Sequence, residues 1–344
     1  MNRNRIIAFA IFAVQVLTAF SAIPVGYYNG ADHKIGDAVL DALFQKIKGH
    51  TAISYKGLEP YYKITDWRSD EKFDGIWDMY STCEFTMADA NKQQKAVCDG
   101  WNKEHSIPQS WFKEKSPMKS DLFHVYPTDA RVNNFRSNLP YGECAGDNGT
   151  GISNNTGKHA LGKVGNSTFE GYSGRVFEPV DEYKGDFART YFYMVARYRD
   201  QALNYSEGAK VFTKNGTTNL TDYAVKLFLK WHREDPVSQK EIDRNEAVFG
   251  IQKNRNPFID YPYLAEYIWG EKKGQKVDFT MLMSSEDSEF VPGQSNGYIG
   301  VETGIDDVTF EPIQPQAVKV LRNGQLLIIK GDKVYNAQGV LINN

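Results

Sequence analysis

The residues best suited to chemistry lie between positions 99 and 140, where acidic, amide, histidine and arginine side chains are dense. The stretch NKEHSIPQSW places Glu104 beside His105, and TDARVNNFRSN adds Asn133 and Arg136 three residues apart. Hydrolysis of a phosphodiester needs a base for the attacking water, a cation for the developing charge and commonly an arginine on the phosphate. An imidazole suits the base, and carboxylate and amide oxygens suit Mg2+. These residues therefore predict metal-assisted hydrolysis, with His105 and Arg136 as catalytic residues and Glu104 and Asn133 as metal ligands.

Two strands and a helix are expected to position these side chains. Glu104 and His105 fall on a first strand, LFHVY (122–126) is a second, and a helix starts after Pro127 with Thr128 as a good N-cap. Asn133 and Arg136, three apart, then share one face of that helix. Neighbours on a regular strand point to opposite sides of a sheet, so Glu104 and His105 can face one ion only where the strand ends.

Longer motifs around these residues closely resemble the secreted bacterial endonuclease I family. The resemblance rests on NKEHSIPQSWF and PMKSDLFHVYPTDARVNNFRSNLPYGE and extends over most of residues 36–272, including WDMYS (77–81), FEPVDEYKGDFAR (177–189), KWHREDPVSQKE (230–241) and RNPFIDYP (255–262). It implies a ββα-metal, or His-Me finger, nuclease in which His105 is the general base and Glu104 and Asn133 are metal ligands. It also implies that the first strand ends at this pair, so that both side chains can face the ion.

Two positions depart from the motif of that family. Lys103 replaces an arginine, which keeps the positive charge but loses the planar guanidinium group with its paired hydrogen-bond donors. Phe123 replaces the first histidine of a pair and leaves only His124. We expect Phe123 to pack into the core.

Structural interpretations remain open beside the functional ones. Glu104 could be an ion-pair partner of Lys103 or Arg131, and Asn133 a capping or turn residue. Arg136 could pair with Asp121 or Asp129 instead of phosphate, and His124 could be a strand residue bonded to backbone. His232 is expected to pack a helix, and YFYMVARY (191–198) to belong to the core. Weaker candidates for substrate contact are Lys103, His124, Asn138 and Arg244.

The chain of 344 residues divides into four segments by composition. Residues 1–21 have a basic start, an apolar run and small residues before a cleavage point, which is the pattern of a signal peptide; a membrane anchor is the alternative. An endonuclease I-like catalytic domain (22–283) precedes a turn-rich linker (284–316) and a tail (317–344) of three expected strands. Helices are expected over 35–50, 186–203, 221–235, 238–252 and 256–270. The predicted fold class is α+β: a His-Me finger core in a largely helical domain, followed by a small β module.

The leader predicts a secreted protein, located in the periplasm, outside the cell or at its surface, with no membrane span after cleavage. The formal charge of −3 gives no sign of a polyanionic partner, so nucleic acid would need a locally basic groove. Three cysteines, Cys83, Cys98 and Cys144, allow three single pairings, of which Cys83–Cys98 is preferred because it closes the shortest loop. A three-cysteine metal site lacks CxxC-like spacing.

The leading function is a secreted, Mg2+-dependent and largely sequence-nonspecific endonuclease. It would use one ion, which other divalent cations could replace, to cut DNA, with RNA left open as a second substrate. A zinc protease is the second hypothesis, but it needs His-Glu-x-x-His and the order here is Glu-His. A surface-binding protein with a decayed nuclease site is the third. The tail resembles small β modules used for sorting or surface attachment, although a plain accessory module would look the same; oligomeric state is left open.

Overall fold

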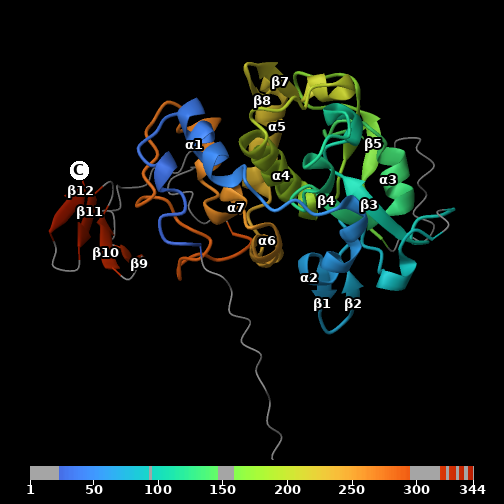
Figure 1. Cartoon of the computed structure of the whole chain (residues 1–344), viewed down its shortest axis with the longest axis horizontal. Helices are drawn as coiled ribbons and strands as arrows, with labels where there is room; N and C mark the ends of the chain where they lie inside the picture. Colours follow the sequence, from blue (N-terminus) through green and yellow to red (C-terminus); the bar gives the residue numbers. More distant parts are fainter. Residues whose placement is uncertain are drawn as a thin grey trace, which may run out of the picture.

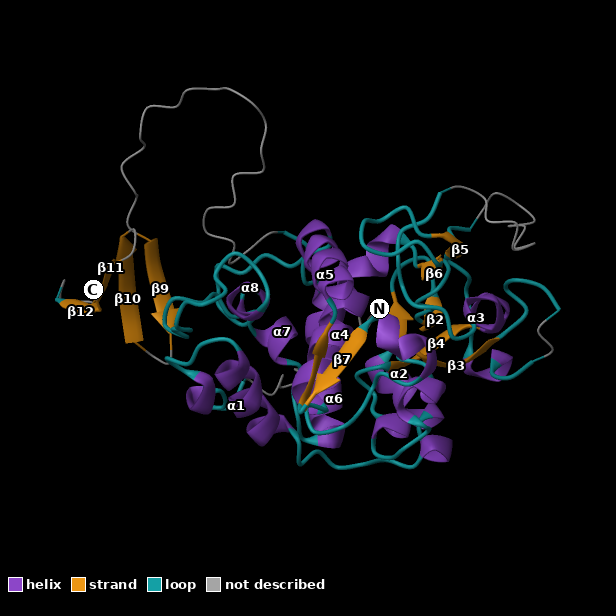
Figure 2. Ribbon diagram, turned by 90° about the horizontal axis from the view of Figure 1, so that it is seen from above, coloured by secondary structure: helices purple, strands orange, loops and turns teal. Residues whose placement is uncertain are grey.

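A buried helix, α4 (Lys184–Arg197), lies in the middle of the molecule (Figures 1 and 2). Thirteen of its fourteen residues are buried, including the charged Asp186, Arg189 and Arg197, so neighbouring elements cover it on every side. Helices α1 (Asp37–Ile47) and α7 (Pro257–Asp260) lie on one side of it, and the strands and helix that carry the candidate site lie on the other (Figure 1). The aromatic run 191–198 belongs to the core, as expected.

The computed structural model describes residues 23–92, 95–145, 159–294, 318–322, 325–330, 333–336 and 340–343. The expected leader, and the linker from residue 295 onward, lie outside these residues.

The predicted helices are present, with shifted ends. Two long helices, α5 (Asp222–Glu234) and α6 (Gln239–Gln252), follow one another, and α6 starts at the predicted capping box of Ser238 and Glu241. Helix α4 stops at Arg197, six residues earlier than expected, because Tyr198 leaves helical geometry. The stretch 256–270 forms two short helices, α7 and α8 (Leu264–Ile268), because Tyr261 precedes Pro262 and is non-helical. Shorter elements are α2 (Tyr62–Thr65), η1 (Asn29–Ala31), η2 (Tyr55–Gly57), η3 (Glu59–Tyr61), η4 (Met87–Asp89), η5 (Gln109–Phe112), η6 (Met118–Ser120), η7 (Asp181–Tyr183) and η8 (Ser206–Lys210).

Strands of the catalytic domain form antiparallel pairs rather than one large sheet. The pairs are β1 (Trp67–Ser69) with β2 (Asp74–Ile76), β3 (Trp101–His105) with β4 (Val125–Asp129), β5 (Lys163–Asn166) with β6 (Arg175–Glu178), and β7 (Phe212–Asn215) with β8 (Thr217–Leu220). The tail forms an antiparallel sheet of β9 (Val318–Arg322), β10 (Gln325–Lys330), β11 (Lys333–Asn336) and β12 (Leu341–Asn343), one strand more than expected.

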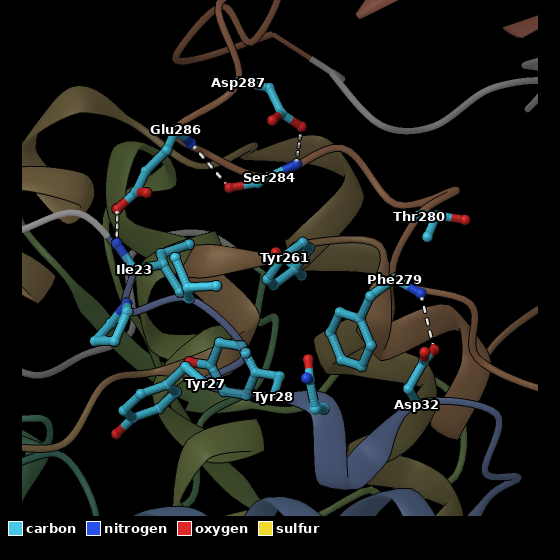
Figure 3. Close-up of a pocket in the computed structure, with 14 residues that line it drawn as sticks. Ile23, Tyr27, Tyr28, Asp32, Tyr261, Phe279, Thr280, Ser284, Glu286 and Asp287 are labelled. Carbon is cyan, nitrogen blue, oxygen red and sulfur yellow. Dashed lines mark hydrogen bonds between the residues drawn. The ribbon is translucent and has the colours of Figure 1, made fainter. Parts of the chain in front are cut away.

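The beginning of the described chain is tied to residues 279–287 (Figure 3). The amide of Ile23 donates to Oε1 of Glu286 at 2.6 Å, and the amide of Phe279 donates to Oδ1 of Asp32 at 3.2 Å. These contacts enclose a pocket of about 270 Å³ whose lining comes from residues 23–32 and 261–287, with none from β3, β4 or α3. Residues 284–294, expected to begin the linker, also pack on the catalytic domain, because Phe290 contacts Val237 and Ile259 and the amide of Gly293 donates to the carbonyl of Val237 at 2.8 Å. None of the helices in the described part of the chain is long and apolar enough to cross a membrane.

Candidate active site

The candidate site is built on β3, β4 and the helix that follows them, α3 (Ala130–Arg136) (Figure 1). The antiparallel register places Glu104 opposite Tyr126 and His105 opposite Val125. Helix α3 leaves the end of β4 and packs back on β3. The strand–strand–helix order expected from the sequence is therefore present, although β4 starts three residues later than the second strand expected over 122–126, whose first residues form a turn.

Asp129, rather than the expected Thr128, caps α3. Its Oδ1 accepts hydrogen bonds from the amides of Arg131 at 2.8 Å and Val132 at 2.9 Å, while Thr128 is buried within β4. A carboxylate at this position satisfies amides that a first helical turn leaves without partners. The other carboxylate oxygen of Asp129 accepts from the amide of Cys98 at 2.6 Å.

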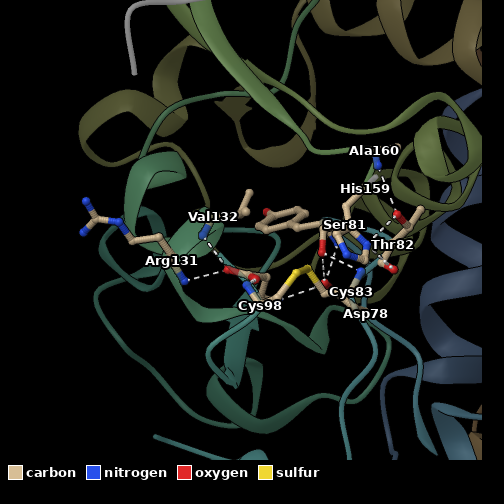
Figure 4. The surroundings of a disulfide bond; sticks show 11 residues. Asp78, Ser81, Thr82, Cys83, Cys98, Arg131, Val132, His159 and Ala160 are labelled. Atoms are coloured by element: carbon tan, nitrogen blue, oxygen red, sulfur yellow. Dashed lines mark hydrogen bonds between the residues drawn. A yellow bond between two sulfur atoms is a disulfide. The ribbon is translucent and has the colours of Figure 1, made fainter. Parts of the chain in front are cut away.

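A disulfide holds the segment that leads into β3 (Figure 4). Cys83 and Cys98 are bridged with their Cα atoms 5.4 Å apart, which confirms the preferred pairing, and Cys144 is free and buried. Near this disulfide, Oδ1 of Asp78 accepts a hydrogen bond from the amide of Asp129 at 2.8 Å. The bridge and the two aspartates thus fix the junction of β3, β4 and α3.

Arg136 lies inside the protein and holds Glu104. It is 1% exposed, and its Nη1 donates to Oε1 of Glu104 at 2.6 Å and to the carbonyl of His105 at 2.8 Å. Its Nη2 donates to the carbonyl of Ser106 at 2.6 Å. The same oxygen of Glu104 accepts from the hydroxyl of Tyr80 at 2.7 Å. This placement does not support a direct grip of Arg136 on phosphate, because the guanidinium is covered and occupied by the site itself.

Glu104 and Asn133 lie at the same interface of β3 with α3. Nδ2 of Asn133 donates to Oδ1 of Asn102 at 2.7 Å, and Asn102 is two residues from Glu104 on β3, hence on the same face. The side-chain hydrogen bonds of Glu104 both end on Oε1, so Oε2 remains as a ligand atom, as does Oδ1 of Asn133. One carboxylate and one amide oxygen fit a hard divalent ion that keeps several waters.

Burial raises the pKa of the Glu104 carboxyl group. Glu104 is 3% exposed, and its desolvation raises its pKa to about 6, against the opposing effects of Arg136 and Tyr80. A nearby divalent cation would favour the ionised form.

His105 is the last residue of β3 and lies under Tyr55. Its ring centroid is 5.4 Å from that of Tyr55, and its Nε2 donates to the carbonyl of Lys119 at 2.9 Å. Burial, and next the neighbouring His124, lower the pKa of His105 to about 3. The imidazole is thus neutral at neutral pH, with one nitrogen fixed as donor and Nδ1 left as the basic atom.

Strand β3 alternates up to its last residue. Asn102 and Glu104 contact α3, whereas Lys103 and His105 both contact Tyr55, with Nζ of Lys103 5.1 Å from the ring centroid. Glu104 and His105 therefore have different neighbours, which differs from the expectation that both side chains turn to one side. The regular pairing of β3 with β4 through His105 keeps the alternation.

The weaker candidates differ widely in exposure. His124 is fully buried, donating to the carbonyl of Met118 at 2.5 Å, and Arg244 is 6% exposed and pairs with Asp66 at 2.8 Å. Neither placement supports direct substrate contact. Lys103 is partly buried and pairs with Glu59, and Asn138 is exposed just after α3. Phe123 packs on Tyr193 in the core and His232 is buried, as expected.

Three residues near the site were not singled out from the sequence. Tyr80 bonds Glu104, Tyr55 covers His105, and Asn102 bonds Asn133. Tyr80 lies in WDMYS and Asn102 opens NKEHSIPQSWF, so the motifs themselves were the available signal for these two residues. Tyr55 lies outside both motifs, and only the folded chain brings it to His105.

Comparisons with known proteins identify the family and several relatives of this chain. The sequence model of the Endonuclease I family matches residues 36–263. The extracellular ribonuclease of Bacillus amyloliquefaciens is 34% identical over 254 residues, which cover 71% of this chain and 78% of that protein. That of Bacillus subtilis (strain 168) is 33% identical over 252 residues, with the same shares. The periplasmic deoxyribonuclease of Aeromonas hydrophila is 26% identical over 147 residues, 43% of this chain and 50% of that protein.

The chain therefore belongs to the endonuclease I family. It is a nuclease, an enzyme that hydrolyses phosphodiester bonds. Nucleases of this family generally depend on a metal ion.

Proposed function

We propose that this nuclease is secreted, uses one Mg2+ ion and cuts nucleic acid with little sequence preference. The observation that carries the proposal is the β3–α3 interface, where a carboxylate oxygen of Glu104 and an amide oxygen of Asn133 remain available beside His105. Both DNA and RNA are proposed as substrates, because the relatives include proteins described as ribonucleases and as a deoxyribonuclease.

In the proposed reaction His105 accepts a proton from the attacking water at Nδ1, while the carbonyl of Lys119 keeps its ring in place through Nε2. Glu104 and Asn133 would hold Mg2+, which would stabilise the charge that develops on the phosphate. The water oxygen forms the new bond to phosphorus as the bond to the leaving sugar oxygen breaks. Glu104 and His105 have different neighbours, which fits their different roles: Glu104 binds the ion, whereas His105 must reach the attacking water and need not touch the ion.

Arg136 and Tyr80 act as positioning residues in this proposal. Their hydrogen bonds to Oε1 of Glu104 orient the carboxylate and leave Oε2 for the ion. Groups that orient a metal ligand commonly matter nearly as much as the ligand itself. This assignment replaces the phosphate contact expected for Arg136.

Secretion is proposed from the leader pattern of residues 1–21 and from relatives described as extracellular or periplasmic. The tail sheet is proposed to serve as a sorting or surface-attachment module. The mass of the secreted protein tests the tail, because loss of the residues after about 283 would indicate processing and a full-length product would argue against it.

The direct test of the nuclease mechanism incubates the purified chain with plasmid DNA and, separately, with a long RNA. Each reaction is run with Mg2+, with EDTA, and with a His105→Ala variant. We expect degradation only when both the metal and His105 are present. Degradation that persists in EDTA or in the variant would contradict the mechanism, and binding without turnover would support a decayed site.

A further inference from the structure

A second polar pocket lies between the end of α4 and two loops that lead to the candidate active site. Its volume is about 370 Å³, and its polar lining is contributed by Lys48, His50, Ser116, Arg197, Asp200 and Gln201. Lys48 and Asp200 are exposed, whereas Arg197 is 6% exposed. The pocket is therefore open to solvent, with a covered guanidinium in its wall.

Arg197 differs from the other buried arginines of the described chain, each of which pairs with a carboxylate. Those pairs are Arg136–Glu104, Arg189–Glu241, Arg199–Asp41, Arg244–Asp66 and Arg255–Asp260. Arg197 donates through Nε to Nδ1 of His50 at 2.8 Å and lies 4.5 Å from the ring centroid of Tyr198. Within the described residues no carboxylate lies within ion-pair distance of it. A buried cation without a counterion is costly, so an anion is the expected missing partner.

The immediate surroundings offset only part of this charge. Arg197 is the last residue of α4, where the helix dipole favours a cation, and the face of Tyr198 adds a further partial interaction. His50 is a neutral acceptor, since burial lowers its pKa against the opposing effect of the nearby Asp121 carboxylate, which forms no ion pair with Arg197. Asp200 belongs to the pocket wall and supplies a carboxylate there, but it forms no ion pair with Arg197. The guanidinium thus retains donors and charge for a ligand in the pocket.

The two loops that form this pocket also cover His105. One runs from Lys48 and His50 to Tyr55, which stacks on the imidazole. The other runs from Ser116 to Lys119, whose carbonyl accepts from that imidazole. Residues two apart are separated by at most about 7 Å between Cα atoms, so Pro117 in the pocket wall lies close to Lys119. A hydrogen bond from the Ser120 hydroxyl to the carbonyl of Ile53 joins the two loops.

We propose that this pocket binds a phosphate group of the same nucleic-acid strand that is cut, near the scissile phosphate. The inference rests on the proposed function and adds a subsite to it. Arg197 supplies a planar guanidinium suited to two phosphate oxygens, and Lys48 adds an exposed charge at the mouth. The carboxylate of Asp200 repels the negatively charged phosphate group and so limits the affinity of the pocket for it.

Binding of a labelled single-stranded oligonucleotide tests the subsite, measured in the full chain with His105→Ala so that the ligand stays intact. Arg197→Gln should weaken binding about tenfold and reduce the slope of affinity against salt concentration by about one. Lys48→Gln should weaken it severalfold, and Asp200→Asn should tighten it. Lys46→Gln, an exposed charge on α1 outside the pocket, is the matched control and should have a smaller effect than Lys48→Gln. Lys48 and Asp200 are exposed, so these variants remain informative if Arg197→Gln fails to fold.

Three outcomes separate this subsite from the nuclease proposal. Equal affinities for Lys48→Gln, Asp200→Asn and the control would overturn the subsite, whether or not the wild type cleaves nucleic acid. If Arg197→Gln loses affinity for inorganic phosphate but not for the oligonucleotide, the ligand is free phosphate and the strand subsite is wrong. In the active chain, Arg197→Gln should raise KM for a long substrate more than KM for bis(4-nitrophenyl) phosphate, which carries no neighbouring phosphate. Failure of the wild type to cleave either substrate would overturn the nuclease mechanism instead.

Discussion

Arg136 and Arg197 are both buried near the candidate active site, yet their surroundings are opposite. Arg136 donates to the carboxylate of Glu104 and to two carbonyls, so its positive charge is paired with a negative charge inside the protein. Arg197 has one hydrogen bond to a neutral histidine and lines a pocket that is open to solvent. The difference teaches that burial alone does not assign a role to an arginine; the presence or absence of a counterion does.

The comparison also separates the two roles proposed for these regions. The site on β3 and α3 is held from within by Arg136, Tyr80 and the helix α4, whose Tyr191 donates to the carbonyl of Ser106 at 2.8 Å. The Arg197 pocket lies between the end of α4 and two loops and is open to solvent. We therefore expect changes in the first region to affect rate and stability, and changes in the second to affect binding.

Loss of the base should have the largest effect. His105→Ala should lower kcat by about 10²–10⁴-fold, the usual contribution of a general base, and leave oligonucleotide affinity within a factor of about two. Single-turnover cleavage and anisotropy measure the two quantities, with His33→Ala, an exposed histidine, as control. A similar loss in both quantities would show that His105 shapes the binding surface rather than the reaction.

Removal of the two arginines compares the regions directly. Arg136→Gln should lower the free energy of unfolding by about 3–5 kcal/mol, because it leaves Glu104 buried without its cation. Arg197→Gln should change it by about 1 kcal/mol or less, because only one hydrogen bond to a neutral group is lost. Urea unfolding measures both, with Arg131→Gln on α3 as control. Equal losses for the two arginines would break the distinction between them.

Removal of the disulfide should weaken the first region and spare the second. Because Cys83 and Cys98 are 15 residues apart, the double alanine variant should lose about 3 kcal/mol of stability. Hydrogen exchange should rise in β3 and α3 and stay unchanged around Arg197. Cys144→Ala, which removes a free thiol, is the control. Faster exchange around both arginines alike would mean that the regions do not unfold separately.

Acid should weaken metal binding through Glu104. An ion needs the ionised carboxylate, and the pKa of Glu104 is raised to about 6, so apparent Mg2+ affinity should be constant above this pH and fall as pH drops below it. The fall approaches about tenfold per pH unit, the limit for one proton. His105, with a pKa of about 3, stays neutral over this range, so His105→Ala should retain the same dependence. Loss of the dependence in that variant would assign the titration to the histidine.

The sequence predicted much of the local structure around the site. The strand–strand–helix order, the capping box of α6, the packing of Phe123 and the Cys83–Cys98 bridge are confirmed. These features depend on short-range spacing, capping chemistry or motif matches. The predicted N-cap of α3 was wrong by one residue. Thr128 and Asp129 are both good N-cap residues, but Thr128 lies within β4, so Asp129 caps the helix.

The burial of individual side chains and the identity of their partners could not be predicted from the sequence. A three-residue spacing placed Asn133 and Arg136 on one helix face, but it gave no sign that Tyr80, from a distant segment, and Tyr141, five residues further along the chain, also lie against Arg136. Arg197 was expected to lie in a helix and in a run of core residues, and it does. Its missing counterion depends on how α4 ends against His50, and a helical pattern holds no information about such a contact.

Metal titration tests the central claim most directly. Mn2+ binding, followed by electron paramagnetic resonance, should be measured in His105→Ala with an uncut oligonucleotide, and again after adding Glu104→Gln or Asn133→Ala. One bound ion per chain, lost or weakened at least tenfold by either substitution, is the predicted result. An ion that binds equally well without Glu104 and Asn133 would contradict the account.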